Sequence, residues 1–229
     1  MSIAANIEKI EERIQKACDA GGRRRDGITL MAVSKFVPAG RVEQAYLAGI
    51  RCFGESRVKE AADKFAGFKE KYPDVTLNLI GSLQSNKAKT AALFFDCIQS
   101  VDRESIIGAL EKHLGLREKP LDVLLELHTG EESKSGFSGI DELFRAADLV
   151  LESKLNPRGL MTMAPFSADR ELVRSSFRRL AKAQRELQKR FPPEENWACL
   201  SMGMSNDFEI AVEEGSTMLR IGGAIFEEQ

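Results

Sequence analysis

The stretch "ITLMAVSKFVPAG", residues 28–40, contains one unit of the pattern that decides the fold. Residues 28–34 form an apolar run of the length that is typical of a buried β-strand. Residues 40–49, which follow, have the apolar spacing of an amphipathic helix. Between them stand Ser34 and Lys35, and a strongly hydrated ammonium at the end of a core strand requires a reason.

The same strand-then-helix unit recurs along the chain. Short apolar runs predict eight strands, at residues 28–34, 50–53, 75–80, 96–101, 121–128, 158–163, 197–202 and 217–221. Amphipathic patterns predict helices between them, at residues 40–49, 56–71, 84–95, 103–114, 138–151, 168–190 and 206–214. Eight strands that alternate with helices favour parallel pairing and closure into an α/β fold, a (β/α)8 or TIM barrel. An open doubly wound sheet is the alternative.

The start of the chain supplies a further helix. After the eighth predicted strand only "GGAIFEEQ" remains, which is too short for a full closing helix. Ile3, Ile7, Ile10 and Ile14 recur at helical spacing after Ser2, a residue that favours helix N-termini. We therefore expect this extra N-terminal helix to cover the position of the last helix. No repeat or linker divides the sequence, which predicts a single domain over residues 1–229.

Composition and charge exclude several classes of partner. The chain has 33 Lys and Arg against 35 Asp and Glu, a formal charge of -2, so there is no basic field for nucleic acid. No segment approaches the roughly 20 apolar residues of a membrane span, and the charged N-terminal segment does not resemble a signal peptide. A cytoplasmic location and a small-molecule partner are the resulting expectations.

The four cysteines give no sign of a metal or disulfide site. They are Cys18, Cys52, Cys97 and Cys199, and none belongs to a CxxC pair or stands near a histidine in the sequence. This spacing predicts reduced thiols that pack in the core.

Polar and glycine residues concentrate where the predicted strands end. In barrels of this kind the active site lies at the carboxyl ends of the strands. The segments at these ends are Ser34 with Lys35, residues 54–57, 81–87, Asp102, and residues 128–130, 162–165, 201–205 and 220–223.

Lys35 is the first candidate for chemistry. A strand-end lysine in the mouth of a barrel is partly desolvated, which favours the neutral amine that attacks a carbonyl to form a Schiff base. The alternative is a rim lysine whose ammonium reaches water.

A phosphate site is expected on the far side of the mouth. The last two strand ends commonly bind phosphate, and here they carry Ser205 with Asn206 at a helix start and the pair Gly222 and Gly223. A helix cap and a plain turn are the alternatives for these residues. A Schiff-base lysine opposite a phosphate site together favour pyridoxal 5'-phosphate, which carries an aldehyde and a phosphate on one ring.

Other candidates carry less weight. His128 is a single histidine without an evident partner, which more often packs and forms a hydrogen bond. Glu55 and Asp102 could act as an acid and a base only if the fold brings them together. Residues 130–137 have the composition of a mobile polar loop.

These motifs together resemble the pyridoxal phosphate homeostasis proteins, the YggS/PROSC group, whose fold is similar to the barrel of alanine racemase. The resemblance runs through "AVSKFVP", "FGESRVKEA", "LIGSLQSNK", "GEESKSGF", "GLMTMAP" and "LSMGMSNDFEIAVEEGSTMLRIGGAIF". It implies a monomeric or weakly associating barrel with the cofactor on Lys35, its phosphate near Ser205, and Arg220 near the pyridine nitrogen. The full set of cofactor-binding residues implied is Lys35, Ser56, Met204, Ser205, Arg220, Gly222 and Gly223.

Three positions depart from the motifs of that family. Ser56 stands where the family commonly has Asn, Ser82 where it commonly has His, and Gly223 where it commonly has Thr. The first two changes affect the expected contacts around the ring, and the third removes a hydroxyl from the phosphate site while leaving a backbone N–H.

The resemblance implies a carrier or buffer of vitamin B6 that is not an enzyme, with cofactor-dependent client enzymes as partners and no metal. The alternative is an amino-acid racemase of low activity that uses the same cofactor, although a second base and a second domain are not evident in the sequence. A class I aldolase, which would share the lysine and the phosphate site, is a third and more distant reading.

Overall fold

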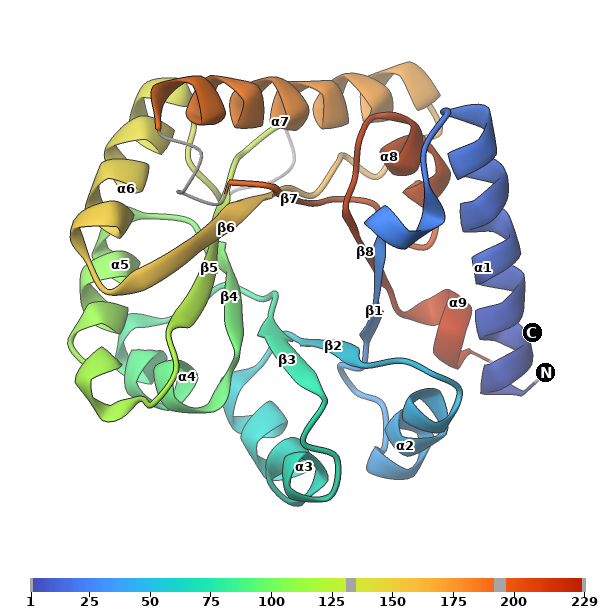
Figure 1. Cartoon of the computed structure of the whole chain (residues 1–229), viewed down its shortest axis with the longest axis horizontal. Helices are drawn as coiled ribbons and strands as arrows, with labels where there is room; N and C mark the ends of the chain where they lie inside the picture. The colour runs from blue at the N-terminus through green and yellow to red at the C-terminus, as the bar shows by residue number, and fades with distance from the viewer. Residues whose placement is uncertain (1, 131–134, 192–196, 228–229) are drawn as a thin grey trace.

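The strands of the computed structural model close into a parallel barrel (Figure 1). The structure describes residues 2–130, 135–191 and 197–227. In chain order the strands are β1 (Thr29–Val33), β2 (Cys52–Glu55), β3 (Thr76–Leu79), β4 (Cys97–Val101), β5 (Leu121–Glu126), β6 (Leu155–Met161), β7 (Cys199–Ser201) and β8 (Met218–Ile221). Each pairs with the next, and β8 pairs with β1, with Met31 opposite Arg220. The predicted (β/α)8 barrel is confirmed, and the open sheet is excluded.

Helices surround this barrel, one after nearly every strand. They are α2 (Ala39–Leu47), α3 (Val58–Lys71), α4 (Ala88–Phe94), α5 (Glu104–Glu111), α6 (Ile140–Glu152), α7 (Arg170–Arg190), α8 (Phe208–Glu213) and α9 (Gly223–Phe226), with 3-10 turns η1 (Arg25–Gly27), η2 (Ser85–Lys87) and η3 (Leu114–Leu116). The longest, α7, begins at Asp169, whose side chain accepts hydrogen bonds from two backbone N–H groups of the first turn. Its apolar face packs on the sheet through Val173, Phe177 and Leu180.

The N-terminal helix α1 (Ile3–Ala20) covers the wall beside the last strand. Its four isoleucines at positions 3, 7, 10 and 14 are buried, and Ser2 caps it by accepting a hydrogen bond from the N–H of Ala5. Figure 1 shows α1 beside α8 and α9, and Asn6 Nδ2 donates to the carbonyl of Ile225 at 3.0 Å. The chain after β8 forms only the one-turn helix α9, so the predicted covering role of the N-terminal helix is confirmed.

Some strand boundaries differ from the prediction. Strand β6 begins at Leu155 rather than at residue 158, and β2 includes Gly54 and Glu55, which were expected beyond its end. Asn156 and Pro157 in β6, and Gly54 and Glu55 in β2, have low intrinsic strand preference. They join the sheet because neighbouring strands supply backbone partners. Among the described residues, no helix has the length and apolar character needed to cross a membrane.

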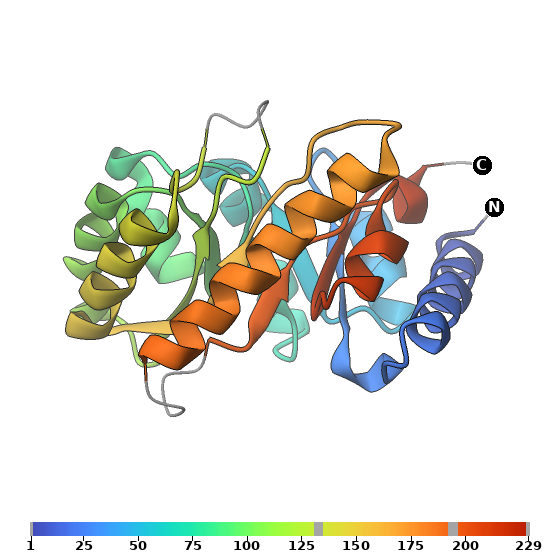
Figure 2. The same cartoon turned by 90° about the horizontal axis from the view of Figure 1, so that it is seen from above.

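The barrel has two distinct ends. Figure 2 shows the loops that follow β5 and β6 on one face, and the turn before β1 on the opposite face. Alternate strand residues point outward to the helices or inward to the barrel axis. In β1, Leu30 and Ala32 belong to the core under the helices, whereas Met31 lies against Gly54 of β2.

Candidate functional site

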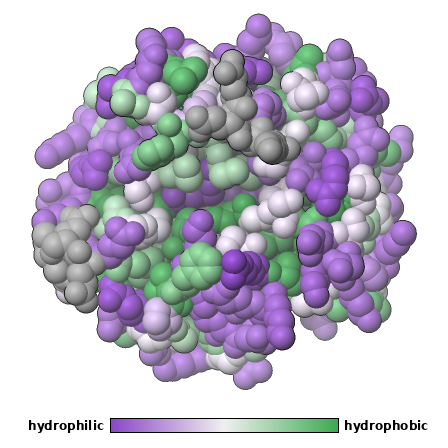
Figure 3. Space-filling model, turned by 180° about the vertical axis from the view of Figure 1, so that it is seen from behind, coloured by the Kyte–Doolittle hydropathy of each residue, from purple (hydrophilic) through white to green (hydrophobic). Residues whose placement is uncertain are grey.

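The face at the carboxyl ends of the strands is hollowed at its centre (Figure 3). Lys35 lies at this face, in the turn that follows β1 and the buried Ser34. Lys35 is exposed and forms no hydrogen bond or ion pair with the described part of the chain. The prediction that the Lys35 amine is partly desolvated is therefore wrong for the free protein. Strand β1 ends at Val33, two residues before Lys35, and the turn that follows carries Lys35 out of the sheet.

The structure brings the predicted phosphate-site residues next to this strand end. The N–H of Ala224 points to the hydroxyl of Ser205 at 3.5 Å, which joins the loop after β7 to the start of α9. Gly222 lies against β1: a Cβ at this position would be 3.1 Å from the carbonyl oxygen of Val33. Ser205, Gly222 and the strand end that carries Lys35 therefore border one region of the mouth.

Gly223 and Met204 have neighbours that the sequence did not reveal. A Cβ at Gly223 would lie 2.9 Å from Oε1 of Glu227, so a carboxylate lies beside the start of α9. The N–H of Met204 donates to Asp207 Oδ1 at 2.6 Å, and burial raises the pKa of Asp207. Met204 and Asp207 also line a cavity of about 300 Å³ beside the mouth.

Arg220 is an interior guanidinium. It is 3% exposed, and its two terminal nitrogens donate to Ser201 Oγ at 2.9 Å and to the carbonyl of Thr162 at 2.7 Å. Burial lowers the pKa of Arg220 to about 10, so it is charged at neutral pH. Arg220 therefore points into the barrel and not to the surface.

A chain of buried polar side chains continues from Arg220 along the inside of the barrel. Ser201 donates to Gln99 Oε1 at 2.7 Å, and Gln99 Nε2 donates to Asn78 Oδ1 at 2.9 Å. Asn78 Nδ2 in turn lies 3.3 Å from the sulfur of Cys52. Because Arg220 can only donate, Ser201 must accept from it, which fixes the direction of the Ser201 and Gln99 hydrogen bonds. Sequence periodicity can predict that these residues are buried but not which partners they meet.

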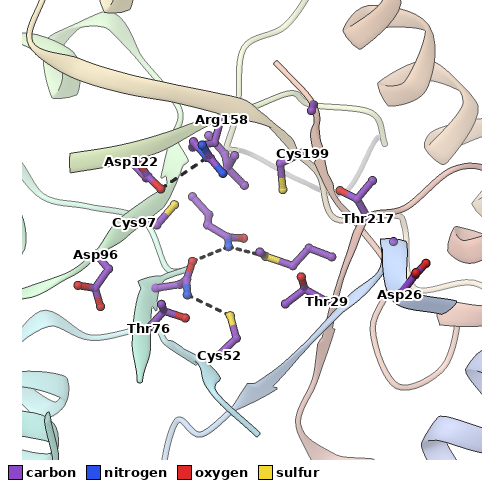
Figure 4. Close-up of a pocket in the computed structure, with 16 residues that line it drawn as sticks. Asp26, Thr29, Cys52, Thr76, Asp96, Cys97, Asp122, Arg158, Cys199 and Thr217 are labelled. Atoms are coloured by element: carbon purple, nitrogen blue, oxygen red, sulfur yellow. Dashed lines mark hydrogen bonds and ion pairs between the residues drawn. The ribbon is translucent and has the colours of Figure 1, made fainter. Parts of the chain in front are cut away.

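This polar chain ends at a cavity of about 470 Å³ at the amino-terminal end of the barrel (Figure 4). Three cysteines, Cys52, Cys97 and Cys199, line it. As predicted, all four cysteines are free thiols, and Cys18 and Cys52 are buried. Cys97 and Cys199 are only half-buried, because they begin strands β4 and β7 at the edge of the cavity. Burial raises the pKa of each of the three cavity thiols.

The charged groups around this cavity are already paired. Asp96 forms an ion pair with Lys69 at 2.8 Å, and Asp122 lies 3.6 Å from Nε of Arg158. Within residues 2–130, 135–191 and 197–227, no cluster of three or more His, Cys, Asp or Glu could hold a metal ion.

The remaining candidates are dispersed. Ser56 lies just after β2 at the mouth, half-buried, and its backbone leaves no room for a side chain at Gly81. Glu55 faces the other way, toward α3, where it pairs with Lys64, whereas Asp102 pairs with Arg103. The two carboxylates thus belong to separate networks and do not form an acid–base pair.

Two groups at the end of β5 stand apart from the sequence prediction. His128 is half-buried, and its Nδ1 is buried without a hydrogen-bond partner among the described residues, contrary to the expected hydrogen bond. Glu126 is buried and accepts from Ser135 Oγ at 2.6 Å, and burial raises its pKa. The predicted polar loop includes residues 131–134, which lie outside the described residues.

A family model described as the alanine racemase N-terminal domain matches residues 2–229. The pyridoxal phosphate homeostasis protein of Vibrio cholerae is 40% identical over 232 residues, covering 100% of this chain and 97% of that protein. PipY of Synechococcus elongatus, solved with pyridoxal phosphate bound, is 32% identical with a TM-score of 0.85, covering 98% of this chain and 100% of PipY. An alanine racemase from E. faecalis shares the fold, with 19% identity and a TM-score of 0.69 over 100% of this chain and 59% of the racemase.

Proposed function

The chain belongs to the family of pyridoxal phosphate homeostasis proteins, and we propose that it binds pyridoxal 5'-phosphate and carries or buffers this cofactor in the cytoplasm. The observation that carries the proposal is the convergence of Lys35, Ser205 and Gly222 at one mouth of the barrel. A relative 32% identical over nearly the whole chain was solved with this cofactor bound, which supports the same chemistry here.

Lys35 supplies the covalent attachment in this proposal. When its amine is neutral, Nζ attacks the aldehyde carbon of the cofactor. A carbon–nitrogen double bond replaces the carbon–oxygen bond, and the oxygen leaves as water with the two amine protons. The product is a Schiff base on Lys35. An exposed lysine with no protein partner can reorient for this reaction without first breaking an ion pair.

The phosphate group is assigned to the loops after β7 and β8. Ser205 offers a hydroxyl, and residues Gly222 and Gly223 present backbone without side chains, which allows close approach of an anion. Gly223 in place of the threonine common in the family leaves its N–H in place. The carboxylate of Glu227 lies beside Gly223, and its negative charge weakens anion binding by repulsion.

Arg220 is assigned to the pyridine nitrogen, with Ser56 and Met204 bordering the ring. Arginine cannot accept a proton, so its donor N–H favours an unprotonated ring nitrogen. Bound pyridoxal phosphate stabilises a carbanion less well in that form. The residues of this chain would therefore hold the cofactor with little tendency to turn over amino acids.

A slow amino-acid racemase is the alternative, and the observation that favours it is the buried Nδ1 of His128, which has no hydrogen-bond partner among the described residues. Racemisation needs a second base on the opposite side of the cofactor. The match to alanine racemase covers only 59% of that chain, and the fold alone is shared. We propose a non-enzymatic carrier, monomeric in solution, that supplies client enzymes dependent on the cofactor.

Absorbance, chemical trapping and a turnover assay test the proposal together. The protein mixed with pyridoxal 5'-phosphate should turn yellow, and borohydride followed by mass spectrometry should place the reduced adduct on Lys35. An adduct on Lys87 or Lys134 instead would overturn the assignment. Racemisation of amino acids at an ordinary enzymatic rate, about 1 to 10³ per second, would favour the racemase.

A further inference from the structure

A buried ion pair lies directly behind the strand end that carries Lys35. Glu55, in β2, is fully buried, and its Oε1 accepts from Ser34 Oγ at 2.7 Å. The same oxygen is 2.9 Å from Nζ of Lys64, which comes from α3 and has a side chain that is 11% exposed. We call Ser34, Glu55 and Lys64 the strand-end clamp.

The clamp also holds the peptide group that joins Ser34 to Lys35. Lys64 Nζ donates to the carbonyl oxygen of Ser34 at 2.8 Å, and this oxygen also accepts from the N–H of Val37 at 3.0 Å. The N–H of Ser34 donates to the carbonyl of Gly54 at 3.0 Å. Every polar group of Ser34 therefore has a partner, and the residue immediately before Lys35 is fixed on all sides.

The residue after Lys35 is held in an unusual conformation. Phe36 has a φ of +62° and is the one non-glycine residue with positive φ in the described part of the chain. Its N–H donates to Glu60 Oε1 at 3.2 Å, and Glu60 lies on α3, one turn before Lys64. A bulky side chain with positive φ persists only where its surroundings enforce that conformation.

A buried ion pair is a poor device for stability alone. The cost of removing both charges from water is often as large as their attraction, and apolar residues of similar size commonly replace such pairs without loss. The pair of Glu55 and Lys64 connects α3, β2 and the backbone of Ser34. It therefore fixes the backbone position from which the Lys35 side chain extends.

We propose that Glu55 and Lys64 are positioning residues for Lys35, which set the backbone geometry from which its amine reaches the aldehyde of the cofactor. This inference rests on the proposed attachment of pyridoxal 5'-phosphate to Lys35. Effective reaction requires the attacking nitrogen to be close to the carbonyl carbon with the correct approach. A long, exposed lysine side chain achieves this more often when its backbone has a single conformation.

The test compares two double variants that each remove one ion pair of α3. Glu55→Gln with Lys64→Met removes the clamp pair and leaves no unpaired buried charge. Asp96→Asn with Lys69→Met is the matched control, because it removes a pair of 2.8 Å from the same helix at the opposite end of the barrel. Ser34→Ala is a milder second probe of the clamp, which removes only the 2.7 Å hydroxyl contact with Glu55.

The readout is the rate at which the visible absorbance of the adduct appears after mixing with pyridoxal 5'-phosphate, with thermal stability measured on the unloaded protein. We expect the clamp variant to form the Lys35 adduct about tenfold more slowly and Ser34→Ala to show a smaller slowing, with the control near the wild-type rate. Lys64→Arg in the protein that retains Glu55 can still donate to both acceptors, so it should form the adduct at a rate between those of the clamp variant and the wild type.

Each outcome separates this inference from the proposed function. Wild-type protein that forms no adduct on Lys35 overturns the proposed function itself. Wild-type protein that forms the adduct, with clamp variants of unchanged rate, overturns only the clamp. Equal slowing in the clamp and control variants also overturns it, because the effect would then follow general stability. If the double variant does not fold, an unchanged rate of adduct formation in Ser34→Ala overturns the proposed role of the clamp.

Discussion

The carboxyl and amino ends of the barrel are both polar, yet they hold their charges differently. At the carboxyl end Lys35 is exposed without a partner in the described chain, and Gly222 and Gly223, the proposed phosphate site, are half-buried. At the amino end the carboxylates of Asp96 and Asp122 pair with neighbouring cations. The thiols there have raised pKa values, which keeps them protonated and weakly nucleophilic.

This difference between the two ends distinguishes a cavity from a reactive site. Volume and polar lining occur at both ends, but a reactive group must be available. Among the described residues, the carboxyl end offers the amine of Lys35 without a partner, beside the backbone that we propose binds phosphate. The buried chain from Cys52 to Arg220 is the link between the two ends. Changes at the two ends should therefore have unequal effects on cofactor binding, and four experiments test this difference.

The largest effect should come from Lys35. Lys35→Ala should abolish the borohydride-stable adduct, because the attacking nitrogen is lost. Replacing Cys52, Cys97 and Cys199 together by serine should leave the adduct unchanged, because serine is close to cysteine in size and these three residues line the cavity at the opposite end of the barrel from Lys35. Intact-mass measurement after borohydride reduction checks both. Loss of the adduct in the serine variant would show that the two ends are not chemically separate.

A substitution at the proposed phosphate site should have the next largest effect. Gly222→Val would place a branched side chain against the backbone of Val33 and obstruct the anion, weakening cofactor binding by about tenfold to a hundredfold. Gly40→Val is the control, since a Cβ at Gly40 meets nothing within 4 Å. Equilibrium titration measures both affinities, and equal values would move the phosphate away from the β8 loop.

The polar chain between the ends predicts a smaller effect. Ser201→Ala removes the acceptor that orients Arg220 and leaves a buried donor unsatisfied, so cofactor affinity should fall about tenfold. Ser216→Ala is matched in burial, but its hydroxyl donates to the carbonyl of Met202 at 2.7 Å and does not contact Arg220. Titration and nitrogen-15 NMR of the labelled ring nitrogen should respond only to the first variant. A similar response in both would separate Ser201 from the site.

The smallest effect concerns pH at the amino end. Burial raises the pKa of the Cys52 thiol from 9.0 to about 12, so the unfolded chain loses this proton at lower pH than the folded protein. The thiol's contribution to stability is thus complete below pH 9 and is lost as pH rises toward 12. Raising the pH from 8 to 10 should therefore lower the free energy of unfolding by about 1 kcal/mol through the Cys52 thiol. Urea unfolding of the wild type and of Cys52→Ala at pH 8 and pH 10 measures this loss. An equal loss of unfolding free energy in the two proteins would contradict the prediction.

The alternation of strands and helices was enough to predict the barrel. Apolar runs and helical spacing are local signals, and eight such units leave few topologies. Local signals also identified Lys35, Ser205 and Gly222 as strand-end residues, because every carboxyl end in a parallel barrel meets at one face. The N-terminal helix was also predicted from a local signal, because the helical spacing of its isoleucines required a surface to cover; the structure extends this helix to Ala20.

The contacts that orient these groups could not be predicted in this way. Ser201 meets Gln99 across 102 positions of sequence, and Glu55 meets Ser34 across 21, so each contact depends on strand register. The three cysteines of the amino-end cavity appear isolated in sequence for the same reason. The exposure of Lys35 depended on where the chain leaves the sheet: β1 ends at Val33, one residue before the predicted end, and the turn that follows exposes the Lys35 side chain.

The packing of α1 against α9 has a consequence for the order of folding. Asn6 and Ile225 are separated by 219 positions, so α1 is synthesised long before the residues of α9 that it contacts. At about 5 to 20 residues per second, that interval is on the order of 10 to 40 seconds. During this time α1 lacks the surface of α8 and α9 that it packs against, and part of its isoleucine stripe is open to chaperones or to other nascent chains. Barrel closure therefore waits for the synthesis of β8 and α9, and a chain interrupted within β7 or β8 keeps that part of the stripe uncovered.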